Sequence, residues 1–232
     1  MIVCPLTFDE CSKHITLRPG TVFLMTPSKS KRSSELKQVI SRISSELRRQ
    51  GFTPLDGCSL IGLGDTVCKI CSTMQGCAMG IGFYHPNVPT DALSNIFWEM
   101  GITQGWGRPA LLIANRKEEV PSDFTRGFSI FFENNRQYRR QFKALLESFK
   151  ERERYYVDTL ADEAVRRADY EKAFTYYQDA FLISGKRQII TKIRKLKDIV
   201  DSERIPKDYK TRLTSIIATY IRDATTSIRS SV

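Results

Sequence analysis

Short apolar runs alternate with amphipathic stretches along the first 149 residues. Residues 21–26 are apolar on both faces, which is typical of a strand buried inside a parallel sheet. Residues 33–50 instead repeat apolar side chains at helical spacing and stop before Gly51. The same alternation predicts further strands at residues 52–55, 78–84, 110–114 and 128–132. It predicts further helices at residues 65–76, about 92–104 and 136–149.

This order of elements indicates the fold class. Strands that are separated by helices long enough for right-handed crossovers form a parallel sheet covered on both faces. We therefore predict an α/β fold: a five-stranded, mostly parallel, flavodoxin-like sheet in the order 2-1-3-4-5, with helices on both faces. Residues 1–149 form this domain, and an all-α appendage follows.

The appendage, residues 150–232, shows only helical periodicity. This periodicity predicts helices at residues 155–167, 170–183, 189–200 and 209–228. The first two, with small alanines at their junction, resemble a single tetratricopeptide-like hairpin, whereas a solenoid needs at least about three repeats. We expect this region to pack or to contact a partner protein, and its Ile and Leu faces favour a homo-oligomer.

Composition and charge narrow the classes of partner. The net charge of +10 over 232 residues divides evenly, with 18 Lys and Arg against 13 Asp and Glu on each side of the 149/150 boundary. Such diffuse charge suits a small anion such as a nucleotide phosphate. It disfavours, without excluding, a nucleic-acid partner. No apolar run approaches roughly 18 residues, and the start of the chain does not read as a signal peptide, so we expect a cytoplasmic protein without a membrane partner.

The six cysteines leave two interpretations. Cys68 and Cys71 have the spacing of zinc and redox motifs, but no second pair follows them. Buried reduced thiols are the simpler interpretation, and we predict no metal and no cofactor. The alternative is a metal site made by these two thiols with Cys77 and a fourth ligand such as His85.

Polar residues follow several of the predicted strands. In doubly wound sheets, ligands bind outside the carboxyl ends of the strands, at the switch point of the strand order. The side chains expected there, as substrate-binding residues, are those of Thr26, Pro27, Ser28, Asp56, His85 and Asn115. The chain has neither the GxGxxG fingerprint nor a P-loop, so a Rossmann dehydrogenase and a P-loop NTPase are both disfavoured.

Asn95 and Glu99 are the polar pair with the clearest chemistry. They are four residues apart and share one face of an otherwise largely apolar helix. A carboxylate near the strand ends can attack or stabilise an electron-poor sugar carbon, as glycosidic-bond chemistry requires. A solvated glutamate on an amphipathic helix is the alternative.

Residues 21–132 resemble the nucleoside 2-deoxyribosyltransferase-like group, which is related in shape to Toll/interleukin-1 receptor (TIR) domains. The matching pieces are TVFLMTPS, Asp65-x₂-Cys68-x₂-Cys71, AMGIGFY, Asn95-x₃-Glu99-x-Gly101, Gly107-Arg108-Pro109 with the strand after it, and Pro121-Ser122-Asp123. The resemblance implies cleavage or transfer at the N-glycosidic bond of a nucleoside, nucleotide or NAD. It implies Glu99 as the catalytic carboxylate with Asn95 and Asp65 in support, and a bacterial defence context.

This chain departs from that group in ways that keep other functions open. Asn95 stands where the classical transferases carry Asp, and either Asp56 or Asp65 can be the acidic residue after the second strand. The helical appendage is not part of a minimal transferase. The alternatives are a non-catalytic nucleotide-sensing module that signals through its appendage, and a structural or nucleic-acid-binding adaptor.

Overall fold

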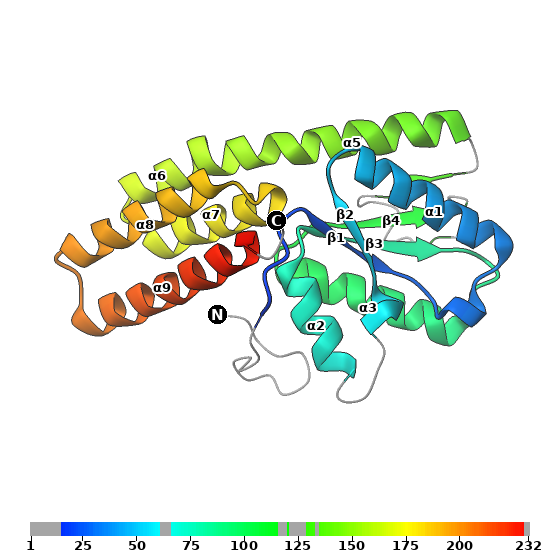
Figure 1. Ribbon diagram of the computed structural model, residues 1–232, viewed down its shortest axis with the longest axis horizontal. Helices are drawn as coiled ribbons and strands as arrows, with labels where there is room; N and C mark the ends of the chain where they lie inside the picture. Colours follow the sequence, from blue (N-terminus) through cyan, green and yellow to red (C-terminus); the bar gives the residue numbers. More distant parts are fainter. Residues whose placement is uncertain (1–14, 61–65, 116–119, 121–128, 133–134, 230–232) are drawn as a thin grey trace. The chain divides into compact units, whose positions relative to one another are not determined.

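A five-stranded parallel sheet forms the centre of the first part of the chain. The computed structural model describes residues 15–60, 66–115, 120, 129–132 and 135–229. Neighbouring strands pair in the order β2-β1-β3-β4-β5, all parallel, which confirms the predicted fold class and strand order (Figure 1). The strands are β1 (Thr21–Met25), β2 (Thr53–Asp56), β3 (Met79–Tyr84), β4 (Ala110–Ala114) and β5 (Ser129–Phe131).

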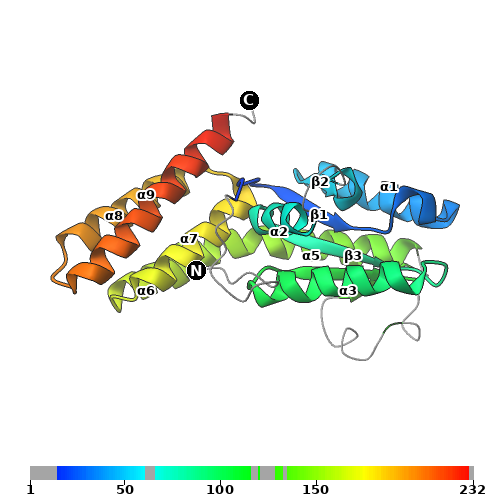
Figure 2. The same ribbon diagram turned by 90° about the horizontal axis from the view of Figure 1, so that it is seen from below.

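Burial explains why the central strands read as continuous apolar runs. Every residue of β1 and β4 is buried, as is nearly all of β3. Helices α1 (Ser34–Arg49) and α5 (Asn135–Tyr155) lie on one side of the sheet, and α2 (Thr66–Gly76) and α3 (Thr90–Gly105) on the other (Figures 1 and 2). Both faces of each central strand are therefore covered, as a parallel sheet requires.

One side of the sheet packs directly under α2 and α3. Phe23 and Met25 of β1 form a buried cluster there with Met74 of α2 and with Ile96 and Met100 of α3. These side chains come from segments up to 77 positions apart, and the cluster joins β1 to the two helices that follow β2 and β3. It fixes the elements that surround the carboxyl end of β1.

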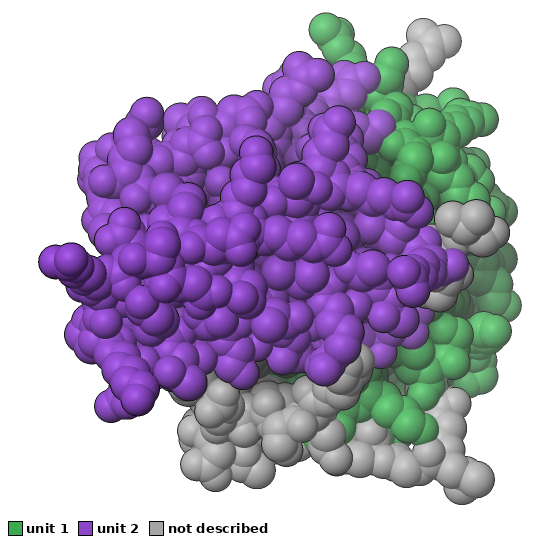
Figure 3. Space-filling model, turned by 60° about the vertical axis from the view of Figure 1, so that its left-hand side comes forward, with its two compact units in different colours: residues 1–15, 20–146 green, residues 16–19, 147–232 purple. Residues whose placement is uncertain are grey.

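The chain divides into two compact units (Figure 3). Unit 1 comprises Met1–Ile15 and Gly20–Leu146, and unit 2 comprises Thr16–Pro19 and Glu147–Val232. The division falls inside α5, whereas the sequence pattern placed the boundary after residue 149. None of the described helices combines the length and apolar composition that crossing a bilayer requires.

The helices of unit 2 follow the predicted ones, with one difference at the start. We expected separate helices at residues 136–149 and 155–167, but α5 extends to Tyr155 and leads directly into a π-helical turn, Tyr156–Ala161, and α6 (Asp162–Arg166). The segment between the expected helices is Lys-Glu-Arg-Glu-Arg, and these residues favour helix and give it no reason to stop. The remaining helices are α7 (Tyr170–Ser184), α8 (Arg187–Ser202) and α9 (Lys207–Arg229).

Candidate functional site

A cavity of about 240 Å³ lies in unit 1 at the carboxyl end of β1. It is bounded by the residues that follow β1, by the segment after β2, and by α2 and α3. Its lining residues are Thr26, Pro27, Ser28, Lys31, Gly57, Cys58, Thr66, Ile70, Asp91, Ala92, Asn95, Ile96 and Glu99. The cavity thus brings together five of the residues expected in the site: Thr26, Pro27, Ser28, Asn95 and Glu99.

One face of α3 forms a wall of this cavity. Asp91, Asn95 and Glu99 follow one another at intervals of four residues, so all three share that face. Asp91 and Asn95 are exposed, whereas Glu99 is half-buried. Along the helix, the wall therefore changes from a water-facing to a desolvated environment.

Glu99 is an acid held away from water, and no described residue compensates its charge. Apolar side chains of Ile70, Ala92 and Ile96 line the same cavity. Burial raises the pKa of Glu99 to about 7 from the 4.5 of an ordinary glutamate. Among the described residues, none donates a hydrogen bond to its carboxylate or forms an ion pair with it. The carboxylate is therefore available to a ligand.

Close packing against the sheet fixes the position of α3. Gly82 of β3 faces the helix, and a Cβ atom there would lie 2.5 Å from Sδ of Met100 and 3.1 Å from Cγ2 of Ile96. A larger residue at this position would push the helix outward. Thr103 adds a hydrogen bond from its hydroxyl to the carbonyl of Glu99, at 2.7 Å. Glu99 is held by the rigid part of the fold, one residue from a side chain in contact with the sheet.

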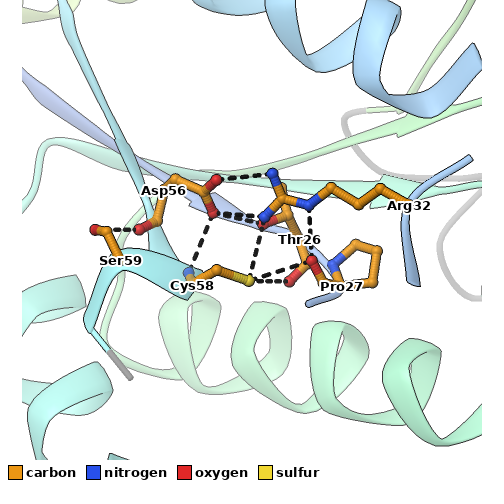
Figure 4. Close-up of polar contacts among 6 residues, drawn as sticks. All are labelled: Thr26, Pro27, Arg32, Asp56, Cys58 and Ser59. Carbon is orange, nitrogen blue, oxygen red and sulfur yellow. Dashed lines mark hydrogen bonds and ion pairs between the residues drawn. The ribbon is translucent and has the colours of Figure 1, made fainter. Parts of the chain in front are cut away.

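A polar cluster, which we name the strand-end clamp, joins the ends of β1 and β2 beside the cavity (Figure 4). It consists of Thr26, Pro27, Arg32, Asp56 and Cys58. The guanidinium of Arg32 donates to both carboxylate oxygens of Asp56, at 2.8 and 2.9 Å, and also to the Thr26 hydroxyl and the Pro27 carbonyl. The Thr26 hydroxyl and the backbone N–H of Cys58 donate to Oδ1 of Asp56, at 2.7 and 3.1 Å.

The clamp leaves Asp56 fully engaged. Burial by itself would raise the pKa of Asp56, but the hydrogen bonds from Arg32 and Thr26 outweigh it and hold that pKa below its usual range. Asp56 does not line the cavity, although its partners Thr26 and Cys58 do. Its position indicates a role in fixing the cavity wall.

An ion pair spans the exposed rim of the cavity. Lys31, in the short 3₁₀ turn after β1, contacts the carboxylate of Asp91 at the start of α3, at 2.5 Å. Both side chains are substantially exposed, at 40% and 67%. The hydrogen bond from Lys31 lowers the pKa of Asp91. Because exposed ion pairs are weak, an anionic ligand could compete with Asp91 for the amine of Lys31.

Besides Asp56, two expected site residues do not line the cavity. His85 is only 2% exposed; its Nδ1 accepts from the N–H of Asn87 and its Nε2 lies 3.0 Å from the carboxylate of Glu35, so it ties the loop after β3 to α1. Asn115 is half-buried after β4. Asp65 lies outside the described residues.

Among the lining and clamp residues, sequence reasoning missed five that are not apolar: Lys31, Arg32, Cys58, Thr66 and Asp91. Arg32 gave no signal, because a lysine- and serine-rich segment after a strand is ordinarily a solvated loop. Asp91 had one, since it shares the four-residue spacing of Asn95 and Glu99. Cys71 and Cys77 are buried, and the part of the chain that is described contains no group of three His, Cys, Asp or Glu side chains able to hold a metal.

The arrangement can bind a ligand with a cationic or electron-poor group at Glu99 and polar groups toward the rim. A carboxylate that lacks partners gains most from a nearby positive charge. No protein-family model, curated protein or solved structure matches this chain. Interpretation of the site therefore rests on its own residues.

Proposed function

We propose that this protein cleaves or transfers across the N-glycosidic bond of a nucleoside, nucleotide or NAD, with Glu99 as the catalytic carboxylate. The observation that carries the proposal is the desolvated carboxylate of Glu99, which has no partner among the described residues, on the wall of a cavity at the strand ends. Cleavage of such a bond builds positive charge on the sugar carbon, and a carboxylate beside that carbon stabilises it.

The chemical step needs only groups that the cavity and the solvent provide. An oxygen of ionised Glu99 attacks C1′ of the sugar as the C1′–N bond breaks and its electron pair goes to the leaving base. Water then attacks C1′ and releases Glu99, giving the sugar and the base. The proton that the water loses goes to a base that leaves as an anion, or to the solvent when the base leaves neutral, as nicotinamide does. With an acceptor base or hydroxyl in place of water, the same intermediate gives transfer.

A substrate with a cationic ring fits this site best. Loss of nicotinamide from NAD neutralises the ring nitrogen, so the leaving group needs no proton. The other carboxylate on the cavity wall, Asp91, is paired with Lys31 and has a lowered pKa, so it is a poor proton donor. A positive ring beside Glu99 would also favour its ionised form.

The size of the cavity limits how much of the substrate enters. Its volume of about 240 Å³ is below the roughly 300–1,000 Å³ of typical ligand pockets. We therefore infer that the ribose and the ring to be released occupy the cavity. The remainder of a nucleotide or dinucleotide would lie at the rim, near Lys31 and Ser28.

The test is to incubate the protein with NAD, NADP, nucleosides and nucleotides and to detect released base by mass spectrometry. Glu99→Gln keeps the shape of the side chain and should lower turnover by at least about 100-fold. Glu151→Gln, an exposed position on α5, is the matched control and should retain full turnover. A wild-type protein that is inert on the whole panel, or a fully active Glu99→Gln, contradicts the proposal. Saturable binding without turnover would instead identify a nucleotide-sensing module.

The pH profile separates two roles of Glu99. A nucleophile must be ionised, so kcat/KM should rise with pH up to about 7, the pKa of Glu99, and then level off. A general acid must be protonated, so kcat/KM would fall above that pH. We expect the first profile for NAD.

A further inference from the structure

A second hollow, of about 330 Å³, lies entirely within unit 2 between α8 and α9. We name it the arginine hollow. Its lining residues are Arg187, Ile190, Thr191 and Arg194 from α8 and Thr225, Ile228 and Arg229 from α9. Three of the seven are arginines and none is acidic, so the hollow carries a net positive charge.

None of the three arginines pairs with a carboxylate in the part of the chain that the structure describes. Arg187, Arg194 and Arg229 are all exposed, and none forms an ion pair with a described carboxylate. Four other arginines of unit 2 are engaged in ion pairs to Glu163, Glu171 and Asp223, namely Arg166, Arg167, Arg212 and Arg222. Gathering three unpaired like charges is unfavourable by itself, and an anion would relieve the repulsion.

Geometry directs the guanidiniums to one hollow. Arg187 and Arg194 are seven residues apart, two turns along the same face of α8. Arg229 stands in the last turn of α9, whose end faces the start of α8 because a short connection makes the two helices antiparallel. Arginine binds phosphate through paired N–H donors, which suits converging guanidiniums.

Among the lining residues, only the arginines have side-chain donors free to bind an anion, because both threonine hydroxyls donate to backbone carbonyls. The hydroxyl of Thr191 donates to the Arg187 carbonyl, and that of Thr225 donates to the Ile221 carbonyl, at 3.4 and 2.7 Å. Ile190 and Ile228 add apolar surface. Helix α8 also begins without a side-chain cap and without an acidic residue in its first turn, so its positive dipole end is uncompensated.

We propose that the arginine hollow binds a small anion carrying two or more phosphate groups, at a site separate from the Glu99 cavity. Beyond the hollow, Lys192 and Lys197 on the same helix pair with Asp158 and Asp201, so much of the adjoining positive charge is already neutralised. A compact polyphosphate therefore fits better than a nucleic-acid strand. This proposal does not depend on turnover at Glu99.

The experiment measures binding of inorganic pyrophosphate and of ATP to the full chain by isothermal titration calorimetry. Arg187→Gln/Arg194→Gln/Arg229→Gln should weaken pyrophosphate binding by at least about 30-fold. The control, Arg154→Gln/Lys172→Gln/Arg204→Gln, removes the same charge from exposed positions of unit 2 and should change the affinity less than about threefold. Melting temperatures of both variants verify folding.

Four outcomes would overturn the proposal. The wild type binds neither anion, the arginine variant binds as the wild type does, or the control loses as much affinity as the arginine variant. The fourth is loss of binding in Lys31→Gln, which would assign the anion to the cavity of unit 1. Binding of a single-stranded oligonucleotide to the wild type and to both triple variants is measured in the same way. If the wild type binds the oligonucleotide more tightly than pyrophosphate, and both triple variants bind it equally weakly, the result would indicate diffuse nucleic-acid binding instead. Unchanged pyrophosphate binding by Glu99→Gln is expected even if the glycosidic proposal fails.

Discussion

Asp56 and Glu99 are two carboxylates beside the same cavity, and their surroundings are opposite. Asp56 accepts two hydrogen bonds from Arg32, one from Thr26 and one from a backbone N–H. Glu99 receives none from the described residues and has apolar neighbours along the cavity wall. Accordingly the pKa of Asp56 is lowered and that of Glu99 is raised to about 7.

The difference separates a stabilising acid from a reactive one. An acid that accepts four hydrogen bonds from the protein contributes to the fold and has little capacity left for a ligand. An ionised acid that is desolvated and has no partner destabilises the fold, and its oxygens can still interact with a substrate. The strand-end clamp and the α3 wall are thus expected to respond in opposite directions to the loss of their charges.

The largest effect on stability is expected from Arg32→Ala. The Arg32 side chain is 7% exposed and its partner Asp56 is 26% exposed, so the variant leaves a largely buried carboxylate unpaired. We expect the free energy of unfolding in urea to fall by about 3 to 4 kcal/mol. Lys31→Ala, the neighbouring residue in an exposed pair, should cost less than about 1 kcal/mol. Equal losses for the two variants would show that the clamp does not stabilise the strand ends.

Glu99→Gln should stabilise the protein at alkaline pH. The folded state holds the Glu99 proton more tightly than the unfolded chain does, because the pKa is about 7 in the folded state against 4.5. As the pH rises from 4.5 to 7, ionisation of Glu99 lowers the free energy of unfolding of the wild type by up to about 3 kcal/mol. Chemical denaturation should therefore give equal stabilities at pH 4 and a more stable variant at pH 8. A variant that is less stable at pH 8 would mean that the carboxylate has a partner.

Asp56→Asn should destabilise the protein, and the pH dependence of this effect should be opposite in sign to that of Glu99→Gln. The lowered pKa of Asp56 means that its ionised form stabilises the folded state above pH 3.8, the ordinary value. The deficit of Asp56→Asn should therefore be greatest at neutral pH and shrink as the pH falls through the pKa of the folded state. The same denaturation series measures it, and a deficit that is independent of pH would point to packing as its cause.

Gly82→Ala should displace the wall that carries Glu99. Its Cβ atom would meet Met100 and Ile96, and overpacking of this kind costs about 2 kcal/mol. Gly101→Ala is the control on the same helix, because a Cβ atom there meets nothing within 4 Å, and it should raise stability by about 0.5 kcal/mol. Thermal melts measure both. If the glycosidic proposal holds, turnover should fall in the first variant only.

The sequence pattern predicts the strands and helices of the fold well, because a strand buried on both faces of a parallel sheet consists of consecutive apolar residues. The four-residue spacing also places Asn95 and Glu99 on one face, and the switch-point rule brings Thr26 to Ser28 into the cavity. Within the strand-end clamp, Arg32 escapes prediction, because nothing local distinguishes it from the basic residues around it. Its burial depends on Asp56, 24 positions away, and on the meeting of two strand ends. Similarly, His85 engages one ring nitrogen with Asn87 and the other with Glu35, 50 positions away, which no motif reveals.

The spacing of Asp91, Asn95 and Glu99 also sets a length scale for the ligand. Eight residues of helix span about 12 Å, so the Lys31–Asp91 pair and the Glu99 carboxylate lie roughly that far apart along α3. A molecule that engages both must be elongated, and it sheds its water at one end while the other end stays hydrated. A compact ligand would reach one end or the other, so the spacing along α3 would favour an elongated ligand.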